Sequence, residues 1–252
     1  MPADASSRSA APVPRKRPVR KAAVPAPVPA VDAHTDAELE DMEATAGEGA
    51  GAARMTQAER RALAERRILD AALELVARRG SVRMTLAEVG EAAGYSRGLP
   101  AHRFGNKAGL LQRVVLNIGA RFEARRLALP QHRPGLDAVR SLVSTYFVRD
   151  DTRWVETRAL LVMMTEGFME DSELNPYIGE YIRSSISRLE QHIRDGIALG
   201  EIRADVDPTT AATLLLGALR GVLHQRLVLG DLRLDKVRNL ALQMVDRTLA
   251  AH

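Results

Sequence analysis

Arg97, His102 and Arg103 place three cationic or polar side chains near the start of a short predicted helix. Phosphate oxygens are favoured at such a position, because the first backbone N–H groups of a helix are free to bind them. Guanidinium groups also recognise guanine in the major groove of DNA. An isolated cluster of this kind is more often a solvated helix face. Here it follows a capped helix and a glycine turn, and this context favours contact with DNA.

Three predicted helices position these side chains, and the first of them is the longest. Thr56 followed by Glu59 is a capping-box pattern, which predicts a helix that begins near Gln57. Gly80 is predicted to end it. The apolar face of this helix has helical spacing and consists of Ile68, Ala71, Ala72, Leu75 and Val76.

The next two helices are short and are joined by a tight turn. Thr85 and Glu88 repeat the capping-box pattern at the start of the second helix. Gly94 supplies a left-handed turn, and Ser96 can cap the third helix. A side chain larger than Gly or Ala at position 90 would hold the two helices apart. Together they form a helix-turn-helix, which lays its second helix in the major groove.

The formal net charge of +4 is small for 252 residues, so its distribution is more informative than its size. Residues 57–107 carry ten Lys and Arg against six Asp and Glu, whereas residues 1–56 and 108–252 are each close to neutral. The basic excess therefore lies on the helix-turn-helix.

Residues 1–56 are rich in Ala, Pro and Gly and contain few large apolar side chains. Such a segment cannot bury enough surface to offset its ordering entropy, which predicts disorder. It has a basic cluster at residues 15–21 and an acidic one at residues 32–48. The segment is either an arm that adds nonspecific phosphate contacts or a solvated extension without a dedicated partner.

Residues 66–111 resemble the DNA-binding domain of the TetR family of bacterial transcriptional regulators. Ile68–Val76 is similar to the family's ILDAALELF-like first helix. Val89–Ser96 is similar to its IAEAAGVS-like second helix and turn, and His102–Leu111 to the HFGSK-E-LL end of its recognition helix. The resemblance covers the three-helix domain nearly end to end, and it implies sequence-specific binding to double-stranded DNA.

The recognition helix departs from the family pattern at one point. Leu99, Pro100 and Ala101 replace the usual Thr-Leu-Tyr, so the tyrosine that commonly contacts a phosphate is absent. Pro100 has no amide donor and is tolerated only in the first turn of a helix, which predicts a start near Leu99. Leu99 and Ala101 can instead pack on thymine methyl groups. The predicted DNA-contacting residues are Thr85, Ser96, Arg97, Gly98, Leu99, Ala101, His102, Arg103 and Lys107.

Residues 108–252 are predicted to form a helical body, because their apolar residues recur three or four apart. Helices are predicted at 107–126 and 135–148, and Asp151 or Thr152 is predicted to cap the next one. Two later helices begin with a cap followed by proline, at Asn175 and at Asp207.

The last two predicted helices, 208–229 and 235–249, have the features of a subunit interface. Gly217 and Gly221 lie four apart and present a smooth strip to a neighbouring helix. A bundle within one chain is the alternative. The family resemblance favours a homodimer that presents two recognition helices about 34 to 36 Å apart, one DNA turn. The predicted interface is Gly217, Gly221, Val237, Leu240 and Met244.

The resemblance also implies a small-molecule site in the helical body. Bulky side chains with a few polar groups are what pockets between helices use, although each such residue is individually more typical of core packing. No residue identifies the effector. The predicted pocket residues are Tyr146, Phe147, Trp154, Arg158, Met163, Met164, Phe168 and His224.

The sequence gives no support to an enzyme. It has no glycine-rich phosphate loop, GxSxG elbow or HExxH pair. It has no cysteine, and its six histidines lack metal-ligand spacing, so neither a metal nor a cofactor is predicted. Glu166 and Glu170 lie four apart, but solvent exposure explains the pair better than acid–base catalysis.

A cytoplasmic location is expected from the absence of membrane signals. The N-terminus has no apolar run of signal-peptide length. The most apolar later stretch, residues 211–219, is far shorter than the ~20 residues that a bilayer span needs.

The sequence thus predicts an all-α protein with a tail (1–56), a helix-turn-helix DNA-binding domain (57–107) and a ligand-binding and dimerisation domain (108–252). Its predicted function is that of a homodimeric repressor that binds a near-palindromic operator and is released by a small-molecule effector. One alternative is a ligand-independent DNA-organising protein. Another is a protein-interaction module that uses the strip of Gly217 and Gly221.

Overall fold

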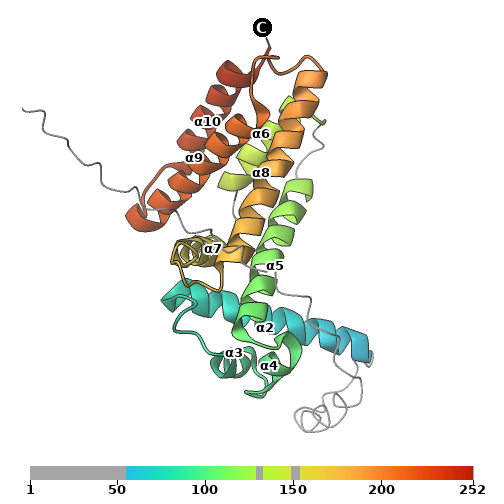
Figure 1. The fold of residues 1–252 in the computed structure, drawn as a ribbon, viewed down its shortest axis with the longest axis vertical. Helices are drawn as coiled ribbons and strands as arrows, with labels where there is room; N and C mark the ends of the chain where they lie inside the picture. Colours follow the sequence, from blue (N-terminus) through green and yellow to red (C-terminus); the bar gives the residue numbers. More distant parts are fainter. Residues whose placement is uncertain (1–54, 129–132, 149–153, 252) are drawn as a thin grey trace, which may run out of the picture. The chain divides into compact units, whose positions relative to one another are not determined.

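The computed structural model describes residues 55–128, 133–148 and 154–251. These residues form the helices α2 (Gln57–Arg79), α3 (Leu86–Ala93), α4 (Leu99–Phe104), α5 (Lys107–Ala128), α6 (Leu136–Phe147), α7 (Val155–Glu166), α8 (Asn175–Ala198), α9 (Pro208–Leu229) and α10 (Leu234–Leu249) (Figure 1). Outside these helices, the described ranges contain one antiparallel bridge, between Ile202 and Ala250. The predicted all-α fold is confirmed. Within the same ranges, no helix is both long and apolar enough to cross a membrane.

Some expectations fall on other parts of the chain. The tail at 1–56 lies outside the described residues except for its last two positions, and so do Asp151 and Thr152. The helix expected after those two residues is α7, which follows Trp154. Trp154 has a left-handed backbone with φ of 57°.

Both predicted capping boxes are present. The Thr56 hydroxyl accepts a hydrogen bond from the Glu59 N–H at 3.2 Å, and the Glu59 carboxylate accepts one from the Thr56 N–H at 2.8 Å. Thr85 and Glu88 make the same reciprocal pair at 3.3 and 2.9 Å. Each box satisfies N–H groups that the first turn of a helix leaves without partners. The starts of α2 and α3 are therefore fixed by residues close in the sequence.

Of the two later helix caps that the sequence predicted, one is present and one is not. Asp207 caps α9 as predicted, and Gly230 ends that helix in a left-handed conformation with φ of 82°. The prediction for Asn175 is wrong, because Leu174 occupies the cap position of α8. The Asn175 amide instead donates to the Gly167 carbonyl at 3.0 Å, so it braces the turn between α7 and α8.

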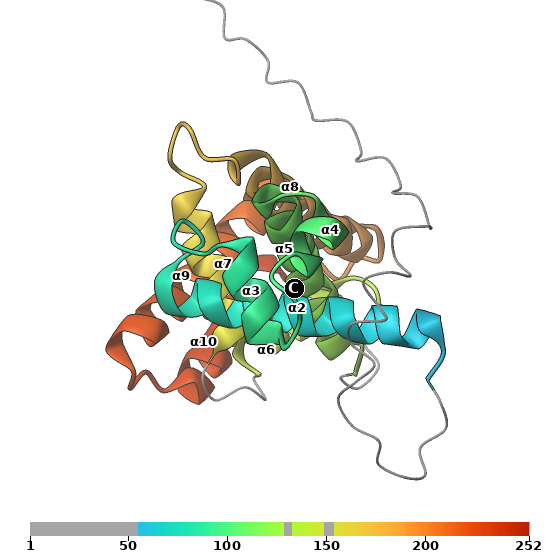
Figure 2. The same ribbon diagram turned by 90° about the horizontal axis from the view of Figure 1, so that it is seen from below.

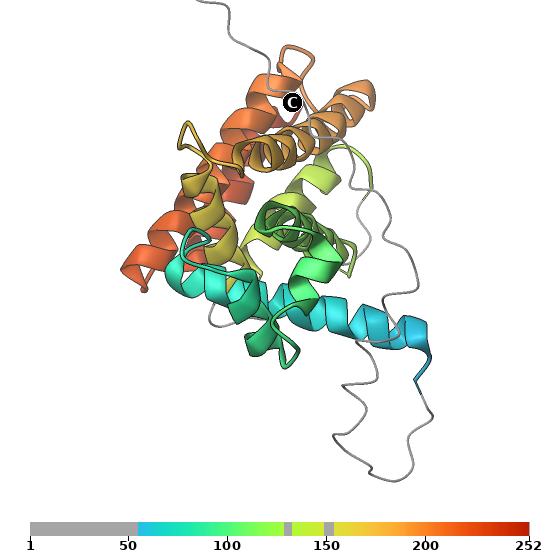
Figure 3. The same ribbon diagram turned by 60° about the horizontal axis from the view of Figure 1, so that its bottom comes forward.

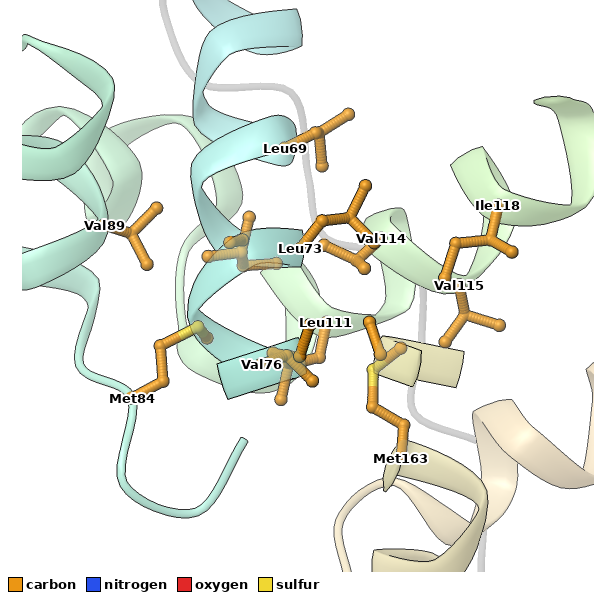
Figure 4. Packing of buried hydrophobic residues seen from close by; sticks show 14 of the residues in the cluster. Leu69, Leu73, Val76, Met84, Val89, Leu111, Val114, Val115, Ile118 and Met163 are labelled. Carbon is orange, nitrogen blue, oxygen red and sulfur yellow. The ribbon is translucent and has the colours of Figure 1, made fainter. Parts of the chain in front are cut away.

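One hydrophobic core joins the helix-turn-helix to the helical body. Helices α2 and α5 supply most of it, α7 adds three residues, and α3 and α8 contribute as well. Figure 4 shows Met163 of α7 in the same cluster as Val76 of α2 and Val115 of α5. This N-terminal core consists of Ile68, Leu69, Ala71, Ala72, Leu73, Val76, Ala77, Met84, Val89, Leu110, Leu111, Val114, Val115, Ile118, Ala159, Met163, Met164, Leu174 and Ile178.

A second core lies within the helical body. It is built by α6, α8, α9 and α10, with Ile202 from the segment after α8. Helix α9 packs on α8, and α10 packs on α6. This C-terminal core consists of Leu136, Val139, Leu142, Val143, Tyr146, Phe147, Leu189, Ile193, Ile202, Ala212, Leu216, Leu219, Leu223, Val245 and Leu249.

Helix α7 lies where the two cores meet. Figure 3 shows it between α2 and α9, and it contacts both. Figure 2 views the molecule from the side of α3 and α4, which lie in front of α2 and the start of α5. Displacement of α7 would therefore disturb the support of the helix-turn-helix on one side and α9 on the other.

The crossing of α3 and the turn before α4 depends on Gly90. A Cβ atom at position 90 would lie 2.4 Å from the carbonyl oxygen of Ser96 and 3.2 Å from Cδ of Pro100. The carbonyl belongs to the backbone and cannot rotate away. A specific close approach therefore explains why a large residue does not fit at position 90. The expectation that alanine would also fit there is wrong, because even its Cβ would meet the Ser96 carbonyl.

We expect Gly90→Leu to lower the free energy of unfolding by about 1–3 kcal/mol or more, because overpacking exceeds the roughly 1 kcal/mol gained in helix propensity. Chemical denaturation followed by circular dichroism measures this change. Gly98→Leu is the matched control, because a Cβ at position 98 meets no atom within 4 Å. Equal stability of the two variants would contradict the proposed constraint.

Candidate DNA-binding site and ligand cavity

The turn between α3 and α4 has the geometry of a helix-turn-helix. Gly94 ends α3 with φ of 80°, and the Tyr95 N–H donates to the Gly90 carbonyl at 2.9 Å. Helix α4 begins at Leu99, as the position of Pro100 predicted. Ser96 does not cap α4, because this late start puts Gly98 at the cap position without a side-chain hydrogen bond.

The predicted DNA-contacting residues lie on α4 and the turn before it, with Thr85 at the start of α3 and Lys107 at the start of α5. His102 and Arg103 are half-buried on α4, and Leu99 is half-buried at its start. Lys107 is half-buried at the start of α5, where its ammonium group donates to the Val82 carbonyl at 2.9 Å. The exposed members of the set are Thr85, Ser96, Arg97, Gly98 and Ala101.

Arg97 is an accessible cation at the turn before α4, and it forms an ion pair with Glu91. Its side chain is 73% exposed and pairs with Glu91 at 3.2 Å. An ion pair between two such exposed groups contributes little and is screened by salt. A phosphate can therefore replace Glu91 at low energetic cost.

The start of α3 is held by charge as well as by its cap. The Thr85 hydroxyl and the Arg79 guanidinium, which lies 2.7 Å from the Glu88 carboxylate, lower the pKa of Glu88 to about 2. Glu88 therefore stays ionised at any physiological pH. Its negative charge also suits the N-terminus of α3, and its pairing with Arg79 links the end of α2 to the start of α3.

A cavity lies among five helices of the body. Its volume is about 30 Å³, which is room for about one water molecule. The walls are mainly apolar and aromatic, and the rings of Phe122 and Tyr146 meet edge to face at 5.1 Å. The lining residues are Ile118, Phe122 and Arg125 of α5, Tyr146 of α6, Glu156, Thr157, Leu160 and Leu161 of α7, Tyr181 of α8, and Arg220 and Leu223 of α9.

Two family models match this chain. Residues 68–114 match the model of bacterial regulatory proteins of the tetR family, and residues 135–250 match that of the BetI-type transcriptional repressor C-terminal domain. The chain belongs to the TetR family. Members of this family are non-enzymatic regulators of transcription that bind DNA and small-molecule effectors.

Solved structures give the same result for the fold. A TetR-family regulator from Rhodococcus sp., described as putative, is 21% identical, with a TM-score of 0.69 over 75% of this chain and 100% of that one. SmeT, the repressor of the Stenotrophomonas maltophilia multidrug efflux pump SmeDEF, is 26% identical, with a TM-score of 0.59 over 74% and 90%. A Saccharomonospora viridis regulator in complex with choline is 21% identical, with a TM-score of 0.60 over 76% and 100%. None of the curated proteins compared matches this sequence.

Within this TetR-family fold, the predicted pocket residues do not form one site. Only Tyr146 lines the cavity, and Phe147 is buried in the C-terminal core. Trp154 packs against the C-terminal core, whereas Met163 and Met164 belong to the N-terminal core. The remaining three, Arg158, Phe168 and His224, are exposed. Sequence reasoning missed the charged lining residues Arg125, Glu156 and Arg220.

The predicted interface residues lie on α9 and α10. Gly217, Gly221, Leu240 and Met244 are exposed, and Val237 is half-buried against the C-terminal core. A Cβ added at either glycine meets no atom within 4 Å. The surface above these glycines is therefore open.

Helix α7 is hydrogen-bonded through Glu166 to the segment between α2 and α3, which leads into the helix-turn-helix. Its carboxylate accepts bonds from the Ser81 N–H at 3.0 and 3.2 Å and from the Ser81 hydroxyl. Gly80 allows this approach, because a Cβ there would lie 2.6 Å from the carboxylate. Ser81 is buried and Glu166 is half-buried, so the interpretation of Glu166 as a solvent-exposed carboxylate is wrong.

We expect Glu166→Ala to lower the free energy of unfolding by about 1–3 kcal/mol, because it leaves the buried Ser81 N–H without an acceptor. Glu170→Ala is the control, since Glu170 is exposed just beyond the same helix. Thermal unfolding of both variants tests the difference. If Glu166→Ala were as stable as Glu170→Ala, the bond would not brace the helix-turn-helix.

Proposed function

We propose that this protein is a homodimeric, ligand-responsive repressor that acts on a near-palindromic operator in the bacterial cytoplasm. The observation that carries this proposal is the double role of α7. The side chains of Glu156, Thr157, Leu160 and Leu161 line the cavity, and Glu166 at the end of the same helix bonds Ser81. One helix therefore joins a candidate effector site to the support of the DNA-binding motif.

The small size of the cavity supports a coupling between binding and movement. Small-molecule pockets usually measure about 300 to 1,000 Å³, whereas this cavity measures about 30 Å³. An effector must therefore displace at least one wall. If that wall is α7, the displacement reaches α2 through Met163 in the N-terminal core and through the bond to Ser81.

The energetic demand on the effector is modest. It needs only to prefer the form of the protein that does not bind the operator. A preference of about 1.4 kcal/mol changes the operator-binding equilibrium roughly tenfold. The description of SmeT as a repressor and the choline complex of the Saccharomonospora viridis regulator are consistent with this mode of action in similar proteins.

An exposed apolar surface on α9 and α10 supports the homodimer. Leu214, Leu240 and Met244 are exposed, as are Gly217 and Gly221. Large apolar side chains beside a smooth glycine strip are suited to a helix-to-helix contact between identical subunits. A dimer would bring two copies of α4 to adjacent turns of the major groove.

Selection of bound sequences from random DNA, followed by footprinting, tests the proposal. We expect a compact two-fold protected site bound far more tightly than random DNA. Arg97→Ala and Arg103→Ala should each weaken operator binding by about tenfold, since hydrogen bonds to charged groups contribute about 1.5–3 kcal/mol. Arg183→Ala is the control, because Arg183 is 69% exposed on α8.

Two outcomes would contradict this function. Equal affinity for selected and random DNA would favour the DNA-organising alternative, and full affinity of both arginine variants would overturn the assignment of the recognition helix.

Gly221→Leu should disrupt the dimer, because it places a bulky side chain on the open strip of α9. Gly221→Ala, which adds one methyl group to open space, should leave the dimer largely intact. Light scattering measures the mass of both variants, and circular dichroism checks that each is folded. A Gly221→Leu protein that stays dimeric would place the interface elsewhere.

A further inference from the structure

Arg220 is the one cavity-lining cation that has no ion pair among the described residues. Its guanidinium nitrogens Nε and Nη2 are buried and have no hydrogen-bond partner in the part of the chain that the structure describes. Its Cζ lies 5.7 Å from the centre of the Tyr181 ring, a contact that offsets part of the cost of burial. A buried guanidinium edge without acceptors is costly, and an anionic acceptor would remove that cost.

We propose that the effector is an amphipathic carboxylate and that Arg220 binds its carboxylate group. This inference rests on the proposed function, because it assigns the chemistry of the ligand that the cavity of this regulator takes.

The charges around the cavity favour an anion over a cation. Glu156 is the acidic residue of the lining, and two arginines already neutralise it. Arg125 contacts its carboxylate at 2.8 Å and Arg121 at 3.1 Å. Arg121 also pairs with Asp70. The unbalanced charge is therefore the positive charge of Arg220, which would repel a cationic head group.

The free edge of Arg220 has the shape that a carboxylate requires. Nε and Nη2 donate in parallel, within the guanidinium plane and along one edge of it, which suits two carboxylate oxygens. Two exposed arginines of this chain use that same edge. Arg203 binds the two Asp205 oxygens at 3.1 and 3.3 Å, and Arg233 binds those of Asp235 at 3.1 and 2.9 Å.

The remaining walls specify the rest of the ligand. Ile118, Phe122, Leu160, Leu161 and Leu223 present apolar surface around the same cavity. Burial of apolar surface favours a hydrocarbon or aromatic body. The head group would pair with the arginine, and the body would occupy the space opened when a wall moves.

Isothermal titration calorimetry of the full-length protein tests the proposal with three probes that share one alkyl chain. The probes are decanoate, decanol and decyltrimethylammonium. We expect decanoate to bind at least about tenfold more tightly than the other two, the effect of one charge-assisted hydrogen-bond pair. No binding of decanoate, or equal binding of all three probes, would overturn the proposal without bearing on operator binding.

Arg220→Gln should lower the affinity for decanoate about tenfold and leave that for decanol unchanged. Arg183→Gln is the matched control, because Arg183 is exposed on α8 and outside the cavity lining. Light scattering of the same variants distinguishes a second role. Unchanged decanoate affinity of Arg220→Gln together with loss of the dimer would assign Arg220 to the subunit interface and overturn the proposal.

Different results would contradict the ligand assignment and the proposed function. Retained operator affinity in saturating decanoate would count against release by this class of ligand, while head-group selectivity that depends on Arg220 would still identify a carboxylate site. Absence of a specific operator would overturn the proposed function but leave the calorimetric result unchanged.

Discussion

The packing of α7 on α2 is the constraint on which the rest of the structure depends. Met163 fills the N-terminal core, and Glu166 bonds the buried Ser81 at the end of α2. Because interiors are close-packed, a shift of α7 cannot be absorbed locally and must move its neighbours or open a gap. The helices of the DNA-binding region are therefore packed against the helical body. The sequence pattern predicted a domain boundary at 107/108. That boundary stays a prediction.

The parts of the fold that the sequence predicted are those fixed by local chemistry. The capping boxes at Thr56 and Thr85 and the left-handed turn at Gly94 depend on residues a few positions apart. Such short-range interactions can be read from residue type and spacing alone. Ser96 and Asn175 show the limit of this approach. In each case another residue took the cap position: Gly98, which fits the late start that Pro100 predicted, and Leu174, which the sequence pattern did not indicate.

The cavity could not be predicted from the same signals. Met163, Met164 and Phe147 have the size and spacing of pocket residues, but core residues share these properties. In the structure all three are buried in one of the two cores. A better signal was an ionisable residue inside an apolar run. Arg220 interrupts the apolar sequence of α9. Burial of an arginine there is costly unless its guanidinium contacts water, a partner or a ligand.

The placement of Arg220 gives a physical reason for the small cavity to expand around a ligand. In this structure the buried guanidinium edge of Arg220 has no hydrogen-bond partner among the described residues, whereas Glu156 is paired with both Arg121 and Arg125. An anion that reaches Arg220 would gain a charge-assisted pair that the free protein lacks. That gain is available only when a wall has moved to admit the ligand. In the proposed mechanism, ligand affinity and displacement of the wall would therefore be coupled. Helix α7 would carry this coupling, because it forms part of the wall and also makes the bond to Ser81.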